Sequence, residues 1–355
     1  MKRIFFLLFS LCLALGACGT PADSGQRVFT VALWNVQTLF DGEETGTEYS
    51  DFREEWGPEK YQARLTSLSQ AIAAMPDMPD LIGLIEVENA QVLEDLSLVL
   101  KQGYSWAAFA NLSGSALGIG FLSRFPLTEV KAHSITIGGE TAPRPVLEVR
   151  LEMEKVSGTT PEAVPLVLIL CHWKSKLGGA DATEALRRAS ARVVNRRLSE
   201  IKAEEPDTPV IVMGDFNLNH DDFFRRSPVL CALLPDDPDA ALLAERSDSM
   251  DFLVLSSEKP PRSDYFPEGT NVLYSPWGQE MESGSYFYRG EWESIDGFLL
   301  SSALFSGTGW DFADSLVLNG EPFVTPEGLP NRYITRTGRG LSDHLPLFLY
   351  LQYLN

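Results

Sequence analysis

The chain of 355 residues is 44% hydrophobic, so it can bury a large core as one α/β domain or as two smaller ones. Its formal net charge of −20 excludes a general affinity for nucleic-acid backbones, and a polyanionic substrate would need local basic groups and bound cations. Its four cysteines, two of them in the N-terminal leader or at its edge, exclude a fold held together by disulfides.

The N-terminus predicts an export signal. Residues 1–17 combine Lys2 and Arg3 with an apolar run too short to span a bilayer and small residues before Cys18. The sequence LGAC, which ends at Cys18, resembles the lipobox of bacterial lipoproteins, in which the cysteine becomes the lipidated first residue; plain signal cleavage is the alternative. We expect an exported protein whose lipidated Cys18 anchors it to a bacterial membrane, facing the periplasm or the cell surface, with residues 18–27 as a flexible leash.

Apolar runs and helical patterns alternate after residue 27, which favours an α/β fold with one domain at 28–355. Residues 231–283 are acidic and poorly periodic, so we expect an insertion or loop excursion there. The predicted strands are 28–35, 80–87, 118–124, 145–153, 164–172, 209–217, 295–301 and 345–354. Two amphipathic helices are predicted, at 58–75 with a core face of Tyr61, Leu65, Leu68, Ile72 and Met75, and at 181–204 with a core face of Ala182, Leu186, Ala189, Val193 and Ile201.

Polar residues able to bind metal or phosphate recur at the ends of these strands. Any one of them has an ordinary explanation as a turn residue, but together they indicate one site for a hard cation and a phosphate. The set consists of Asn35, Glu86, His172, Asp215, Asn217, Asp296, Asp343 and His344.

These residue types suit hydrolysis of a phosphate ester. Glu86 and Asp343 supply negative charge for a cation such as Mg²⁺, with Mn²⁺ as a substitute, while Asn35 and Asn217 supply neutral groups that do not repel phosphate. Histidine titrates near neutral pH, so His344 suits the role of general base. We expect a protonated His172 to stabilise charge on the phosphate oxygens.

The stretch VIVMGDFNLNHDD carries the densest signal. In an extended chain Asp215 and Asn217 face the site together while Phe216 points into the core. Gly214 is expected to permit a sharp turn and the approach of substrate to the backbone. We interpret the residues that follow, His220, Asp221 and Asp222, as a solvated turn.

Seven motifs in order resemble the endonuclease/exonuclease/phosphatase superfamily across residues 28–355: LWNVQTLFD, DLIGLIEVEN, GIGFLSRFPL, CHWKSK, VIVMGDFNLN, SIDGFLL and LSDHLPL. The resemblance implies a deoxyribonuclease-like, four-layer sandwich of two packed mixed β-sheets flanked by helices. The version with EVEN, HWKSK and GSYFYRGEW looks most like exported bacterial proteins labelled as nucleases. Cys171 and Gly297 depart from the common pattern of that branch without removing a ligand.

The resemblance also implies roles for the site residues. Asn35 and Glu86 would contact metal, with Asp343 nearby, and Asp215 and Asn217 would engage the attacking water and the phosphate. Asp296 would orient His344, and His172 matches a histidine that contacts phosphate. Whether Asp215 or His344 takes the proton stays open.

Basic and aromatic residues bear on the substrate. Lys174 and Lys176 could reach a phosphate or belong to a solvated loop, and Arg332, Arg336 and Arg339 form a second group that could face phosphate. Most arginines of 187–197 are interpreted as an outer charged helix face. Tyr286 and Tyr288 are interpreted as a packed strand pair, with base stacking as the alternative.

The leading hypothesis is a Mg²⁺-dependent, monomeric phosphodiesterase that acts on nucleic acid with little sequence preference. The first alternative is a phosphatase or a sphingomyelinase-like or phospholipase C-like hydrolase of a phospholipid or small phosphate ester, which the acidic charge and predicted membrane anchor encourage. The second alternative is an inactive surface-binding lipoprotein.

Overall fold

The computed structural model describes residues 28–354 apart from 102, 143, 155–162, 227–228 and 279–283. The predicted signal segment 1–17, Cys18 and the leash 18–27 lie outside the described residues, so lipidation stays a prediction. None of the helices in the described ranges is both long enough and apolar enough to cross a membrane.

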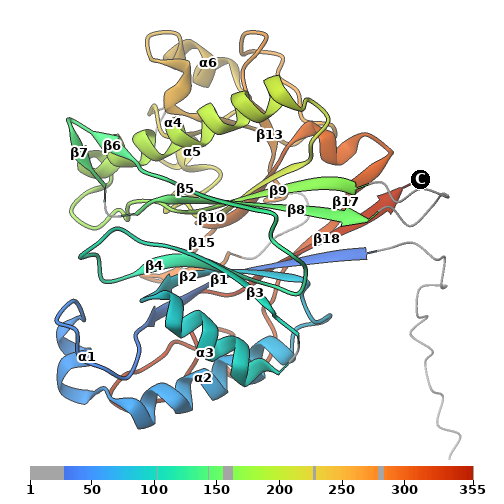
Figure 1. The fold of residues 1–355 in the computed structure, drawn as a ribbon. Helices are drawn as coiled ribbons and strands as arrows, with labels where there is room; N and C mark the ends of the chain where they lie inside the picture. Colours follow the sequence, from blue (N-terminus) through green and yellow to red (C-terminus); the bar gives the residue numbers. More distant parts are fainter. Residues whose placement is uncertain are drawn as a thin grey trace, which may run out of the picture.

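Two mixed β-sheets pack face to face between layers of helices, which confirms the predicted four-layer sandwich (Figure 1). At one point of contact a Cβ added to Gly83 in one sheet would lie 2.7 Å from Met213 Cε in the other. The six-stranded sheet has the order β17 (Gly309–Val317), β18 (Leu347–Leu354), β1 (Val28–Leu39), β2 (Leu81–Val87), β4 (Gly118–Ser123) and β3 (Trp106–Ala110). The eight-stranded sheet has the order β11 (Leu233–Pro235), β12 (Leu253–Ser256), β13 (Val272–Tyr274), β16 (Asp296–Leu300), β10 (Val210–Asp215), β9 (Ala163–His172), β8 (Val146–Glu154) and β5 (Glu129–His133).

Helices cover the outer face of each sheet (Figure 1). The predicted helix at 58–75 is α2 (Pro58–Ala73), whose side chains Tyr61, Leu65, Leu68 and Ile72 are buried as expected. The helices on the side of the six-stranded sheet are α1 (Ser50–Glu55), α2 and α3 (Ala90–Leu100), and those on the side of the eight-stranded sheet are α4 (Ala180–Glu204), α5 (Asp222–Arg225) and α6 (Pro238–Ala244). Short 3₁₀ turns lie at Ser249–Asp251 and Ser302–Phe305, and two hairpins are β6 (Thr136–Ile137) with β7 (Glu140–Thr141) and β14 (Tyr286–Tyr288) with β15 (Glu291–Glu293).

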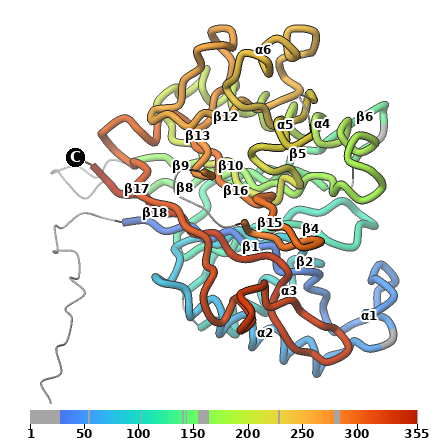
Figure 2. Tube along the Cα trace, turned by 180° about the vertical axis from the view of Figure 1, so that it is seen from behind, coloured from blue at the N-terminus to red at the C-terminus, as the bar shows by residue number. Residues whose placement is uncertain are grey.

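All eight predicted strands are present as β1, β2, β4, β8, β9, β10, β16 and β18. The segment 231–283 differs from the expected loop excursion, because it contains α6 and adds β11, β12 and β13 to the edge of the eight-stranded sheet (Figure 2). These strands have three or four residues each, too few for a hydrophobic period to stand out in the sequence.

The buried face of α4 differs from the predicted one. Ala189 and Ile201 are buried as expected, but Ala182 is exposed and Leu186 and Val193 are only partly buried. The reason is that polar and small residues occupy much of the inward face. Arg187, one of the arginines of which most are expected on the outer face, is fully buried.

Arg187 owes its burial to a complete set of partners. Its guanidinium donates to Glu184 at 2.7 and 3.0 Å, to Thr183 Oγ1 at 2.8 Å, and to the carbonyls of Lys174 and Ala180. Lys174 lies in the loop that follows β9, so this interaction fastens the loop to α4.

We expect Arg187→Met to lower the free energy of unfolding by about 3–5 kcal/mol, because the buried Glu184 loses its closest ion-pair partner and keeps only Arg226, at 3.9 Å, among the described residues. Urea unfolding measures this change. Arg196→Met, at an exposed position of the same helix, is the matched control and should change stability by less than about 0.5 kcal/mol. Equal losses in the two variants would contradict the role given to Arg187.

Candidate active site

The predicted polar residues meet at one cleft with a volume of about 890 Å³. Asn35 and Asp296 are buried behind its lining, where they hydrogen bond to Asp215 and His344. The predicted residues that line the cleft are Glu86, His172, Asp215, Asn217, Asp343 and His344.

Strand register brings three of these residues into one row. Asp215 at the end of β10 is paired with His172 on the parallel neighbour β9 and with Asp296 on the antiparallel neighbour β16. The three side chains therefore come from adjacent positions of one sheet, although they span 125 residues of sequence.

Glu86 reaches the cleft, and Asn35 reaches its position behind the lining, through backbone irregularities in the other sheet. The strand β1 does not end at Asn35 as predicted; its register against β2 shifts between Asn35 and Leu39, where Gln37 and Thr38 have φ of 51° and 53°. Glu86 lies in a second shift and has φ of 66°, a left-handed conformation that is uncommon for a residue other than glycine. Backbone strain of this kind is concentrated at functional sites.

The side chain of Asn35 has a defined orientation. Its Oδ1 accepts from the Gln37 amide at 3.0 Å, so its Nδ2 faces Asp215 Oδ2 at 3.1 Å and Glu86 Oε1 at 3.4 Å. The amide nitrogen, rather than the oxygen expected to contact a metal, therefore points toward the two carboxylates. Metal contact by Asn35 stays a prediction.

Gln37 was not singled out in the sequence, yet it joins the two ends of the chain at the cleft. Its Oε1 accepts from the amides of Tyr333 at 2.9 Å and Asp343 at 3.0 Å, and its Nε2 donates to the Tyr333 carbonyl. The segment that carries Asp343 and His344 is thereby held against β1.

A histidine–carboxylate pair lies at the centre of the site. His344 Nδ1 is 2.8 Å from Asp296 Oδ2, which also accepts from Ser285 Oγ at 2.7 Å. The ring of Tyr286 packs against His344 with 4.6 Å between centroids, so this tyrosine is both part of the strand pair expected and a wall of the cleft. The pair fits the role expected for Asp296, which is to orient His344.

The protonation states differ from those expected for the two histidines. Burial alone would lower the pKa of His344, but the carboxylate of Asp296, its hydrogen bond, and Asp215 together raise the pKa, so the ring is a cation at neutral pH. Burial lowers the pKa of His172 well below its ordinary value, and the charges of Arg144 and His344 lower it further. His172 is therefore neutral, in contrast to the protonated form expected.

Asp215 is a cleft-lining carboxyl group whose pKa is raised to about 7. Burial raises this pKa, and the nearby Asp296 raises it further. Its Oδ2 is 3.6 Å from His172 Nε2. A carboxylate with a raised pKa, placed at the floor of a cleft, can accept a proton from water.

The motif around Asp215 follows the prediction only in part. Phe216 is buried and packs edge-on against Trp173, as expected. Asn217 lines the cleft, but through a left-handed backbone with φ of 52° rather than an extended one, and its Nδ2 donates to the Trp173 carbonyl. Gly214 contacts protein rather than substrate, since a Cβ there would overlap the Cys171 carbonyl oxygen of the neighbouring strand.

The basic residues divide into structural and cleft-lining groups. Lys174 is half-buried near Arg144 and Arg187 and is not among the described residues that line the cleft, while Lys176 pairs with Asp222 at 2.8 Å. Of the three arginines expected as a group that could face phosphate, Arg332 and Arg336 line the cleft and Arg339 does not. Arg144 also lines the cleft and was missed, because no motif marks it.

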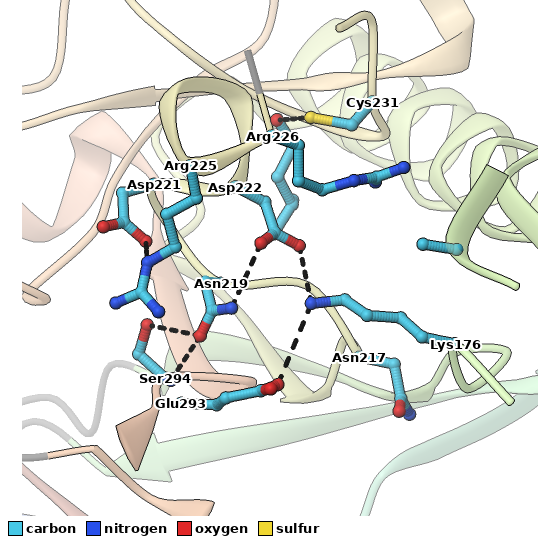
Figure 3. Close-up of polar contacts among 12 residues, drawn as sticks. Lys176, Asn217, Asn219, Asp221, Asp222, Arg225, Arg226, Cys231, Glu293 and Ser294 are labelled. Atoms are coloured by element: carbon cyan, nitrogen blue, oxygen red, sulfur yellow. Dashed lines mark hydrogen bonds and ion pairs between the residues drawn. The ribbon is translucent and has the colours of Figure 1, made fainter. Parts of the chain in front are cut away.

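The end of the stretch at 210–222 is not a solvated turn throughout. Asp222 is buried and pairs with Lys176, and Asn219 is buried between Asp222 and Ser294 (Figure 3). Only Asp221 and His220 keep partial exposure.

The fold is that of a nuclease-like α/β sandwich. The profile of the Endonuclease/Exonuclease/phosphatase family matches residues 30–238, and the chain belongs to this family. No curated protein sequence matches the chain significantly.

Solved structures share the fold at low sequence identity. A truncated TDP2 of Caenorhabditis elegans has a TM-score of 0.52 at 14% identity, covering 91% of this chain and 97% of that protein. The D. rerio TDP2 in complex with a single-strand DNA product has a TM-score of 0.51 at 16% identity, covering 91% of this chain and 98% of its own. These likenesses show the fold alone.

Two glycines that face each other across β10 and β16 give a matched test of the packing at the site. Gly214→Ala should lower the free energy of unfolding by about 1–3 kcal/mol, because the added Cβ overlaps the Cys171 backbone. Gly297→Ala should have a small effect, since its nearest neighbour would be Trp277 Nε1 at 3.4 Å. Thermal unfolding of both variants measures the difference, and a larger loss at Gly297 would contradict this interpretation.

Proposed function

We propose that the protein is a metal-dependent phosphodiester hydrolase that cleaves nucleic acid by in-line attack of an activated water. The observation that carries this proposal is the Asp296–His344 pair beside Asp215, at a cleft that Glu86 and Asp343 also line. Family membership supports the phosphodiesterase class.

The donor set fits a hard cation. Glu86 and Asp343 line the cleft with side chains 21% and 22% exposed, so two carboxylates are open to it. Among the described residues, ligand atoms of Asp215, Asp296 and His344 also lie within 4.8 Å of one another. Because Asp296 and His344 are already bonded to each other and buried, we assign that trio to proton handling.

Glu86 and Asp343 would therefore hold Mg²⁺ or Mn²⁺, while Asn35, whose Nδ2 is 3.4 Å from Glu86 Oε1, would orient the Glu86 carboxylate. When bound, the cation would polarise the phosphate and offset the negative charge of the substrate.

The protein groups divide the remaining chemistry among themselves. Asp215, with a pKa raised by burial, accepts the proton of the attacking water. The His344 cation, held by Asp296, stabilises charge that builds on the phosphate oxygens, and the neutral His172 can donate a hydrogen bond to them. This division favours Asp215 over His344 as the base.

Nucleic acid is the preferred substrate because three arginines that could contact backbone phosphates line the cleft, namely Arg144, Arg332 and Arg336. Five carboxylates line it as well, so a bound cation would be needed to offset their charge. The D. rerio TDP2 structure, which shares the fold, is in complex with a single-strand DNA product. A phospholipid or a small phosphate ester is the second candidate, favoured by the acidic charge and the predicted membrane anchor.

His344→Ala should reduce kcat by about 10²–10⁴-fold, because the cation that stabilises the transition state is lost. Residues 19–355 would be assayed with Mg²⁺ or Mn²⁺ on plasmid DNA, RNA, sphingomyelin and inositol phosphates. The control is His133→Ala, on the edge strand β5, which should keep full activity. Turnover of lipid but not of DNA would overturn the choice of substrate, and the absence of any metal-dependent turnover would favour an inactive binding protein.

Glu86→Ala should lose activity at low metal concentration and regain part of it as metal is raised, because one carboxylate ligand is removed. A titration of activity against Mg²⁺ measures the shift. Unchanged activity at low metal would refute the assigned role of Glu86.

We also propose export and anchoring through Cys18, on the basis of the leader sequence. Cys18→Ser should move the protein from the membrane fraction to the soluble fraction of a bacterial host, as immunoblotting would show. Retention of the variant in the membrane fraction would contradict lipidation.

A further inference from the structure

Behind the cleft, a row of buried polar side chains links the loop after β9, the end of β10 and the start of β16 (Figure 3). Asn219 and Asp222 are each 3% exposed. Neither lines the cleft, so neither can touch a substrate there. Buried polar groups of this kind cost free energy unless they are fully bonded, so their arrangement calls for a physical explanation.

Asn219 extends the pairing of β10 and β16 beyond the end of the strands. The last backbone hydrogen bond there runs from the Phe216 amide to the Ile295 carbonyl at 2.8 Å. Past this point the chains separate, and Asn219 Oδ1 takes the place of a backbone carbonyl by accepting from the Ser294 amide at 2.7 Å. Ser294 Oγ lies 3.4 Å from the same oxygen. The asparagine side chain thus fixes the position of the backbone at Ser294.

Asp296 follows Ser294 by two residues, and its backbone carbonyl accepts from Trp277 Nε1 at 2.8 Å while its amide donates to Ser285 Oγ at 3.3 Å. Its Oδ2 carries the bonds to His344 and Ser285, while its buried Oδ1 has no hydrogen-bond partner among the described residues. The direction of the carboxylate therefore depends on where the backbone of residues 294–296 lies. The Asn219–Ser294 bond is one of the interactions that hold it.

Asp222 fixes the direction of the Asn219 amide. Its Oδ1 accepts from Asn219 Nδ2 at 3.1 Å, and its Oδ2 pairs with Lys176 at 2.8 Å. A flipped amide would bring its oxygen against this carboxylate and its NH₂ against the Ser294 amide, both repulsive. Lys176 also lies 3.8 Å from Glu293, so the loop after β9 is tied to the same segment.

We propose that Asn219, oriented by Asp222, is a positioning residue that sets the backbone of Ser294–Asp296 and thereby the contact between Asp296 and His344. It acts on the reaction only through that pair. The kinetic part of this inference rests on the proposed function, whereas its structural part does not.

The structural test uses the small number of histidines. The sequence has only four, so protein labelled with ¹⁵N-histidine gives a simple NMR spectrum. Asp296→Asn identifies the His344 Nδ1 proton as the downfield resonance that moves when its carboxylate partner is replaced. Asn219→Ala should shift that resonance upfield, because the hydrogen bond to Asp296 lengthens.

The kinetic test is a double-mutant cycle with bis(p-nitrophenyl) phosphate and Mn²⁺. Asn219→Ala should lower kcat by about 10- to 100-fold with little change in KM, as expected for a misplaced catalytic group. In the Asp296→Asn background the same substitution should cause no further loss, because a residue that acts through Asp296 has nothing left to position.

Controls separate positioning from general destabilisation. Asn271→Ala removes bonds to Asn195 and Ser199 far from the cleft, and should lower thermal stability without moving the His344 resonance or kcat. An unmoved resonance in Asn219→Ala, or additive losses in the cycle, would overturn the inference. If the wild type does not hydrolyse the diester at all, the proposed function fails and the NMR result alone decides the role of Asn219.

Discussion

The pairing of β10 with β9 on one side and β16 on the other is the constraint on which the site depends. Hydrogen bonds between these strands place His172, Asp215 and Asp296 side by side. Burial raises the pKa of Asp215, and the like charge of Asp296 beside it raises this pKa further. The cationic His344 lowers it in part. The sheet therefore supplies both the geometry and the electrostatics of the site, and stability is traded for a carboxylate ready to take a proton.

Much of this arrangement could be read from the sequence, because the relevant signals are local. Long apolar runs marked the eight central strands, and the polar residue types at their ends marked Glu86, Asp215 and His344. Parallel and antiparallel neighbours bring such ends together at one edge of a sheet, so residue type and position sufficed to gather the cleft residues without knowing the register. Strands such as β17, where Asp311 and Asp314 interrupt the apolar pattern, gave no comparable signal.

The remaining features depend on contacts between distant segments, which local patterns do not encode. The bulges at Asn35 and Glu86 depend on strand register, and the burial of Arg187 and Asp222 depends on partners outside their own elements, the Lys174 carbonyl and the Lys176 side chain. Protonation states also depend on distant segments. A histidine in a sequence is expected to have a pKa near its ordinary value, and only the surroundings make His172 neutral and His344 a cation. Gln37 and Arg144 carry no motif at all, so only the fold shows their roles.

Gln37 holds the segment of Tyr333 and Asp343 against β1, and these contacts determine when the cleft can form during synthesis of the chain. The cleft needs residues from segments far apart in the sequence, since β1 pairs with β18 and Gln37 Oε1 accepts from the Asp343 amide. Contacts of such long sequence separation form late in folding. A growing chain that has not reached β18 lacks His344 and one of the two strand partners of β1, so the cleft forms only after these residues have been made. If export and nuclease activity are as proposed, this delay would keep an active cleft away from the nucleic acid of the cell that makes the protein.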